Sequence, residues 1–260
     1  MHIVLHSNGT ILLCGGFQNE EKCLQLDHGI WKDHSILNEA RIGHSTVSTQ
    51  TATFLFGGTE KSRTSYEYLP KDSKTWIMGE TEIPEGFTNG CAIAVKSGQE
   101  ILLIGGRKTE KRVLCFNVKD HTFQVLPSRL NVMRLEHRCA FIPNTTKVMI
   151  TGGGAVSHTR YSKRLESTEI LDTKDGSVFT ASPMKYKRIG HGMGSITING
   201  KDRLAVFGGH TGKKMLDSVE LYNTQTEKWE ATNMRLKKPK VNFSFLNIKL
   251  SEIISQFQNA

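Results

Sequence analysis

Short apolar runs that each end at two glycines recur along the chain. The runs occupy residues 11–14, 54–56, 101–104, 148–151 and 204–207, and the diglycines that follow begin at Gly15, Gly57, Gly105, Gly152 and Gly208. Each run is almost continuously apolar, which is typical of a strand buried on both faces. The diglycines are 42, 48, 47 and 56 residues apart. A period of this size indicates one supersecondary unit copied five times.

The fifth copy shows what the unit contains. Residues 193–198 predict a first strand, and Asn199-Gly200 is a strong hairpin signal before the second strand at 204–207. Residues 217–222 alternate polar and apolar side chains, as in a half-exposed third strand, and a short fourth strand carries Trp229. Such a four-stranded antiparallel sheet cannot bury both faces alone, so we expect it to stack on its copies.

The other copies share an opening and a closing signal. An Arg-x-x-His tetrapeptide opens three copies, at Arg41, Arg134 and Arg188, and the histidines are His44, His137 and His191. One aromatic residue closes each copy: Trp31, Trp76, Phe123, Phe179 and Trp229. Together with the diglycines, these aromatic residues are predicted to be structural, in the core and turns.

The openings, the diglycines, the third strands and the closing aromatics resemble the kelch repeat family. The resemblance covers residues 2–248, with repeats at about 2–36, 41–80, 87–128, 134–183 and 188–233. It implies an all-β fold, a β-propeller of four-stranded antiparallel blades around a central channel, as in the central domain of galactose oxidase. Kelch rings usually have six or seven blades.

The two ends do not match a regular ring. No arginine precedes His2, and residues 241–248 alternate like an extra first strand without a sixth diglycine. Residues 249–260 are expected to be a C-terminal tail. Two alternatives remain: a five-bladed ring with one strand left over, or an incomplete ring, six-bladed for example, whose further blades or domains lie in sequence before Met1. The ends favour the second.

Composition and charge narrow the class of protein. The chain has 260 residues, a formal net charge of +9 and no apolar run near the roughly 18 residues of a membrane helix. The basic residues come in small groups at loop positions, without the aromatic interleaving of nucleic-acid sites, so neither nucleic acid nor membrane is an expected partner. Five widely spaced cysteines make disulfides unexpected and favour reduced thiols in the cytoplasm, with the nucleus as an alternative.

Catalytic and cofactor motifs are missing from the sequence. We find no Gly-x-Gly-x-x-Gly, no Gly-x-Ser-x-Gly and no His-Glu-x-x-His. Because His44, His137 and His191 recur at one repeat position, we expect them to form hydrogen bonds within each blade and not to bind a metal. The sequence thus predicts no catalytic residue, no metal and no cofactor.

A non-catalytic protein-interaction module is therefore the expected function. In the substrate-adaptor kelch proteins, arginines at the repeat opening and after the diglycine hold acidic peptides, since a guanidinium binds a carboxylate through two hydrogen bonds. By resemblance, the candidate partner-binding residues are Arg41, Arg107, Arg134 and Arg188, with Arg160 in the basic loop 155–164 and His210 after the fifth diglycine. Alternatively, the opening arginines only brace neighbouring loops. Two other functions stay open: a sugar-active enzyme related to galactose oxidase or the mutarotases, and actin or cytoskeletal binding.

Overall fold

Five four-stranded antiparallel sheets make up the computed structural model, which describes residues 2–17, 20–58, 62–155 and 163–246. Blade 1 contains β1 (His2–Leu5), β2 (Ile11–Cys14), β3 (Lys22–Asp27) and β4 (Ile30–Ile36). Blade 2 contains β5 (Ser45–Ser48), β6 (Ala52–Phe56), β7 (Tyr66–Pro70) and β8 (Ile77–Met78). Blade 3 contains β9 (Cys91–Val95), β10 (Glu100–Ile104), β11 (Arg112–Asn117) and β12 (Thr122–Arg129).

The last two blades follow the same order. Blade 4 contains β13 (Arg138–Phe141), β14 (Lys147–Thr151), β17 (Thr168–Asp172) and β18 (Val178–Ala181). Blade 5 contains β19 (Gly192–Ile198), β20 (Lys201–Phe207), β21 (Ser218–Asn223) and β22 (Lys228–Arg235). A two-stranded ladder, β15 (Gly154–Ala155) with β16 (Lys163–Arg164), projects from blade 4 at the base of the loop 155–164.

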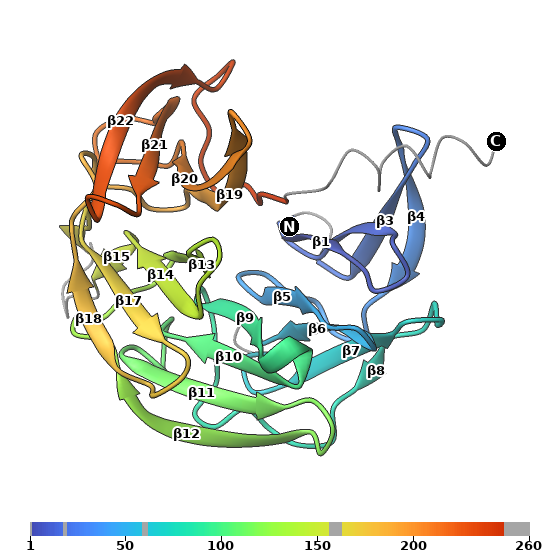
Figure 1. Cartoon of the computed structure of the whole chain (residues 1–260). Helices are drawn as coiled ribbons and strands as arrows, with labels where there is room; N and C mark the ends of the chain where they lie inside the picture. Colours follow the sequence, from blue (N-terminus) through green and yellow to red (C-terminus); the bar gives the residue numbers. More distant parts are fainter. Residues whose placement is uncertain (1, 18–19, 59–61, 156–162, 247–260) are drawn as a thin grey trace.

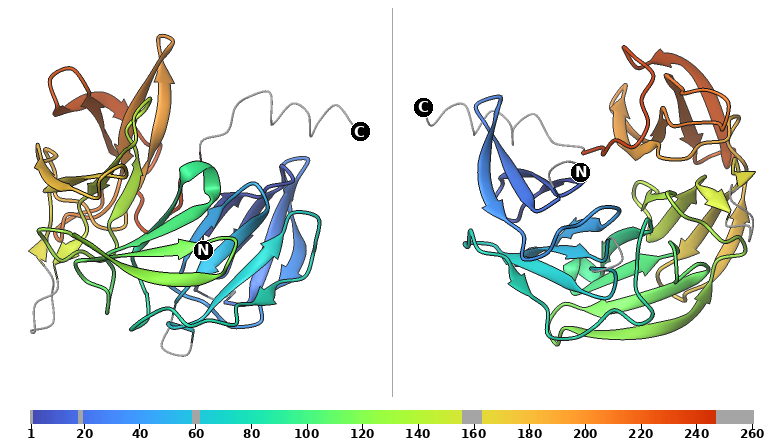
Figure 2. Two further views of the ribbon diagram at one scale, coloured as in Figure 1. Left: turned by 60° about the horizontal axis from the view of Figure 1, so that its bottom comes forward. Right: turned by 180° about the vertical axis from the view of Figure 1, so that it is seen from behind.

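The blades stand around a common axis. Their first strands contact one another in the order β1, β5, β9, β13 and β19, so the predicted all-β propeller is confirmed, with five blades. Blades 1 and 5 lie on either side of an opening in the ring, and the chain after β22 runs toward the N-terminus in the middle (Figure 1). Views from other sides show the same open arrangement (Figure 2).

The continuous apolar runs are explained by packing on two neighbours. In β10, Leu102 packs in a cluster with Val148 and Ile150 of blade 4, whereas Leu103 packs in a cluster with Phe54 and Phe56 of blade 2. Because successive side chains of a strand point to opposite faces, a blade between two others needs apolar residues at every central position.

The diglycines join each blade to the next opening. The amide of the second glycine donates to the carbonyl of the opening residue of the following blade, at 2.7–3.1 Å: Gly16 to Arg41, Gly58 to Phe87, Gly106 to Arg134, Gly153 to Arg188 and Gly209 to Lys240. A Cβ on Gly57 would lie 1.8 Å from the carbonyl oxygen of Phe87, and φ there is +67°. Only glycine allows this approach.

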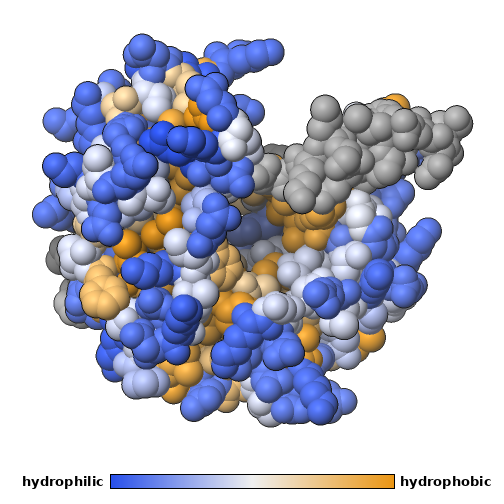
Figure 3. Space-filling view, in the orientation of Figure 1, coloured by the Kyte–Doolittle hydropathy of each residue, from blue (hydrophilic) through white to orange (hydrophobic). Residues whose placement is uncertain are grey.

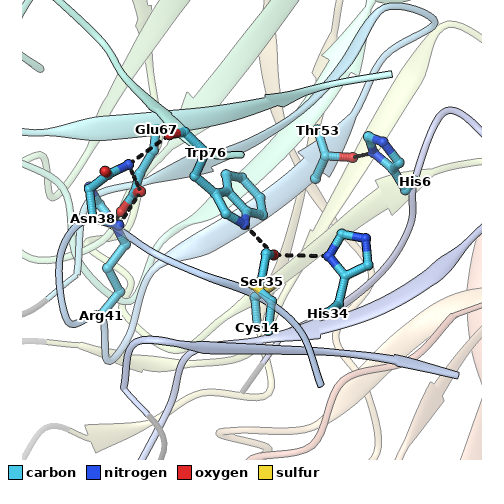
Figure 4. The surroundings of a disulfide bond; sticks show 10 residues. His6, Cys14, His34, Ser35, Asn38, Arg41, Thr53, Glu67 and Trp76 are labelled. Carbon is cyan, nitrogen blue, oxygen red and sulfur yellow. Dashed lines mark hydrogen bonds and ion pairs between the residues drawn. A yellow bond between two sulfur atoms is a disulfide. The ribbon is translucent and has the colours of Figure 1, made fainter. Parts of the chain in front are cut away.

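A buried ion pair fixes the opening of blades 2, 4 and 5. In blade 2, Nε of Arg41 donates to Glu67 at 2.7 Å (Figure 4). Nη1 of Arg41 also donates to the carbonyl of Gly57 at 2.8 Å. The second carboxylate oxygen of Glu67 accepts the backbone amide of Asn38 at 2.8 Å. Arg134 with Glu169 and Arg188 with Glu220 repeat this arrangement, and all six side chains are at most 1% exposed.

Blade 3 replaces the ion pair with an apolar contact. Phe87 stands where Arg41 stands in blade 2, since each carbonyl accepts the amide of the second glycine of the preceding diglycine. In the third strand, Leu114 takes the place of Glu67. Both residues are buried in one hydrophobic cluster. Both partners of the ion pair are therefore exchanged together, which leaves no unpaired charge inside the blade.

A second set of backbone hydrogen bonds links the openings around the axis. Each amide donates to the equivalent carbonyl of the previous opening, at 2.7–3.2 Å: Asn89 to Gly43, Glu136 to Asn89, Gly190 to Glu136 and Asn242 to Gly190. Residues 240–243 thus dock on blade 5 as every opening docks on its predecessor. The extra strand expected at 241–248 does not form in its described part, 241–246; residues 247–248 and the tail 249–260 lie outside the described residues.

Two of the closing aromatics are not core residues. Trp76 and Trp229 are buried, and Phe123 packs against the cluster between blades 2 and 3. In contrast, Trp31 is 39% and Phe179 is 53% exposed, so the prediction is wrong for these two. Both lie in outermost strands, β4 and β18, where the sequence keeps the aromatic of the repeat but the side chain is exposed.

The expectation of reduced thiols is also wrong for four cysteines. Cys14 is bonded to Cys23 and Cys91 to Cys139, and Cys115 is free and buried. The first pair is directly opposite in β2 and β3, and the second joins the first strands of adjacent blades. The pairings, between cysteines 9 and 48 residues apart, depend on which strands become neighbours and not on spacing in the sequence.

We predict that the ion pair of blade 4 behaves as a unit. Arg134→Phe or Glu169→Leu alone leaves one buried charge without a partner and should cost about 3–5 kcal/mol of unfolding free energy. The double variant copies blade 3 and should cost at least about 2 kcal/mol less than the sum of the two single costs. Urea unfolding of all four proteins measures this coupling. The same cycle on the exposed pair Arg203–Glu230 should give less than about 1 kcal/mol, and additive costs in blade 4 would contradict the prediction.

We also predict that only one of the five cysteines carries a free thiol. Burial raises the pKa of Cys115 to about 11, so the thiolate that reacts with iodoacetamide is scarce at pH 8. Mass spectrometry should show no alkylation of the native protein and one alkylated cysteine, Cys115, after unfolding without reductant. Labelling at Cys91 or Cys139 under these conditions would show that the bond between blades 3 and 4 is absent.

Candidate functional site

The opening arginines are not available to a partner. The side chains of Arg41, Arg134 and Arg188 are 0% exposed. Their guanidinium nitrogens donate to a glutamate, to the first glycine carbonyl of the diglycine and to a serine at or just before the start of the third strand. The structure therefore corrects the expectation that these three line a face pocket, and it agrees with the alternative that they brace the neighbouring loops.

The other predicted residues have different surroundings. Arg107 is exposed, and its backbone pairs with Thr88 beside the diglycine. His210 is half-buried; its backbone pairs with Ile189, and its Nδ1 accepts the amide of Gly212 at 2.9 Å. Arg160 lies outside the described residues. Of the described candidates, Arg107 is thus the one that is both charged and exposed, as partner binding requires.

All loops that follow a diglycine or precede a first strand emerge on one face of the ring, because the blades share one strand order. We call this the opening face. Over blades 4 and 5 its described loops carry many basic side chains: Lys163, Arg164, Lys185, Lys187, Lys213, Lys214, Lys237, Lys238 and Lys240. All except the half-buried Arg164 are exposed. The described acidic residues in these loops are Glu136, Glu166 and Asp217, so the balance is strongly positive.

Over blades 1 and 2, and in the connection to blade 3, the opening face has the opposite charge. Its described loops carry six acidic residues: Glu20, Glu21, Glu39, Glu80, Glu82 and Glu85. Arg63 is the exposed basic residue of the described part of these loops, and Glu85 pairs with Arg112 of blade 3. The net charge of +9 is thus distributed unevenly. Hydrophilic side chains cover much of the outer surface of the blades, whereas hydrophobic ones are visible inside the ring (Figure 3).

The recurring histidines pack between blades. The ring of His44 lies against the position of Gly15 in the previous blade, and His137 lies in the same way against Gly105. Among the described residues, no side-chain partner is found for a ring nitrogen of His44 or His137, whereas His191 contacts Thr151 of the previous blade at 2.7 Å. The carbonyls of Arg41 and Arg134, in the same openings, lie near enough to raise the pKa of His44 and of His137 slightly. Burial lowers the pKa of His44 and of His137 to about 3, so both rings are neutral at pH 7.

A cavity of about 370 Å³ lies on the axis of the ring. It is lined by residues of the first four blades and of the segment after β22, among them His2, His44, Asn89, Glu136, Arg138 and Asn242. Burial lowers the pKa of Arg138, and the nearby Glu136 carboxylate opposes this shift. The sequence alone did not reveal this site, because residues of six separate segments form it. One signal was readable: Arg138 follows an opening histidine, where Ser45 and Gly192 stand in other blades.

Comparison with known proteins does not assign the chain: no family model matches it, and no curated protein matches its sequence. Among the described residues, no three His, Cys, Asp or Glu side chains are grouped so that they could hold a metal ion. No helix of the described part of the chain is long and apolar enough to span a membrane.

The buried histidines predict a dependence of stability on pH. The folded-state pKa of about 3 for His44 and His137 lies below the unfolded value of about 6.5. The unfolded chain therefore binds more protons between these values, and stability is lost as the pH falls through this window. Each histidine should contribute a loss of about 1.4 kcal/mol per pH unit below 6.5.

Urea unfolding between pH 7 and 4.5 measures this loss. His137→Phe, which places at this position the residue type found at Phe243 of the sixth opening, should remove one histidine's share of the slope. His28→Phe, at an exposed position, is the control and should leave the slope nearly unchanged. A slope that does not change in His137→Phe would contradict the assignment.

Proposed function

We propose that this protein is a kelch-type propeller that acts as a non-catalytic protein-interaction module and binds an acidic partner surface. The observation that carries the proposal is the exposed basic half of the opening face over blades 4 and 5. In propellers, the sheets provide a rigid frame while loops at one end supply binding. The repeat pattern, the five-bladed fold and the basic half of the opening face support this assignment together.

The arrangement of charge favours a particular orientation of the partner. The basic half attracts an acidic segment, while the glutamates over blades 1 and 2 repel it. Complementary charges of this kind raise association rates and select against wrongly oriented partners. Arg107 and its neighbours Lys108 and Lys111 in blade 3 lie between the two halves. We therefore propose a contact surface that runs over the loops of blades 3, 4 and 5.

A charge-reversal experiment tests the proposal. Lys213→Glu with Lys214→Glu should weaken binding of a fluorescein-labelled oligoglutamate peptide at least about fivefold at low salt, because the two changes alter the local charge by four units. Fluorescence anisotropy over a salt series measures this, and the affinity of the wild-type protein should fall as salt rises.

The matched control is Lys119→Glu with Lys201→Glu, which changes the net charge equally. Both lysines are exposed at strand turns on the opposite face of the ring. If the two double variants weaken the peptide equally, binding follows net charge and not the basic half of the opening face, and the proposed surface is wrong.

A further inference from the structure

Arg138 is a half-buried cation without an ion pair in the described part of the chain. Its Nη1 donates to the carbonyl of His137 at 3.0 Å, and Glu136 is near enough to influence its pKa but does not form an ion pair with it. In contrast, Arg134, four residues earlier, makes hydrogen bonds through Nε, Nη1 and Nη2. The two arginines therefore have different roles: Arg134 is fully used by the fold, whereas Arg138 keeps unused donors beside the axial cavity.

The repeat itself does not require a charge at this position. The equivalent residues in the other blades, which pair with the residue just before the diglycine as Arg138 does, are His2, Ser45, Cys91 and Gly192, and His2 is neutral because burial lowers its pKa. None of these is charged, and their blades have the same four-stranded form. A large cationic side chain that is unnecessary for the blade and costly to desolvate is more consistent with binding than with packing.

The remaining lining groups complement an anion. Asn89 and Asn242 place amide groups at the same cavity, and no hydrogen bond of these side chains is found in the described structure. His2 and His44 are neutral, because burial lowers the pKa of each, so they add no charge. Glu136 is the one carboxylate among the described lining residues, and it should weaken the binding of any anion.

We propose that the axial cavity binds a carboxylate group through Arg138, with the amides of Asn89 and Asn242 as further donors. The planar guanidinium matches a carboxylate in a two-hydrogen-bond geometry, and a cavity of about 370 Å³ admits a small organic acid or one inserted acidic side chain. The site differs from the basic half of the opening face. If the ligand is a small organic acid, this inference does not rest on the proposed protein-interaction function.

Calorimetric titration with two probes tests the site: glutarate, a free dicarboxylate, and a short capped peptide that contains glutamate. Arg138→Met should weaken binding of the probe by tenfold or more, because it removes the guanidinium and keeps an unbranched side chain of similar stem length. Glu136→Gln should tighten binding about threefold, because it removes the opposing charge. Arg129→Met is the control, at an exposed arginine of β12, and should leave the affinity unchanged.

The two probes distinguish the sources of the carboxylate. Binding of glutarate that depends on Arg138 assigns the cavity to a small acid, even if the peptide and the rim lysines prove inactive. Binding of the peptide alone, with the same dependence, assigns it to an inserted side chain. If neither probe binds, or if Arg138→Met and Glu136→Gln leave affinity unchanged, the proposal is overturned. A tighter Glu136→Gln complex cannot result from misfolding, so the test holds even if Arg138→Met is unstable.

Discussion

The buried pairing of an opening arginine with a third-strand glutamate is the interaction on which blades 2, 4 and 5 depend. In blades 2, 4 and 5 it ties the opening loop, the carbonyl of the diglycine and the third strand at one point. Burying both charges is tolerated because hydrogen bonds occupy both groups, whereas loss of one partner leaves an uncompensated charge. The arginines that suggest ligand binding in the sequence are therefore occupied by the fold, and recognition must use other residues.

Much of the fold could be read from the sequence because it depends on local patterns. The apolar runs, the diglycines and the Asn199-Gly200 turn locate strands within each blade, and the blades occupy the expected repeats. Contacts between blades are less accessible. Cys91 and Cys139 are 48 residues apart and become neighbours only when two first strands lie side by side. Whether Arg41 is exposed likewise depends on Glu67, 26 residues later. Aligning the third strands would have shown that Phe87 occurs with Leu114, where blades 2, 4 and 5 have arginine with glutamate.

The candidate site shows the same limit. Charges on single loops are visible in the sequence, but their distribution over the ring is not. Lysines of the loops 182–191 and 236–243 gather on one half of a face only because those loops emerge beside each other. The axial cavity is still less local, since six chain segments contribute to it and Arg138 is distinguished only by comparison with its equivalents. Function in this protein therefore rests on departures from the repeat, while the repeat itself maintains the frame.

The segment after blade 5 illustrates how such departures match one another. Gly192 and Gly194 alternate along β19, and a Cβ on them would lie 2.6 and 2.2 Å from the rings of Phe243 and Phe245. Blade 2 has Ser45 and Val47 at the equivalent places, where no such rings need room. Phe245 also stacks on Phe207 at 4.7 Å between ring centroids. The two glycines and the two phenylalanines, each pair two residues apart, are thus complementary in spacing and volume. Residues 240–246 therefore form a sixth opening on blade 5 that the sequence encodes.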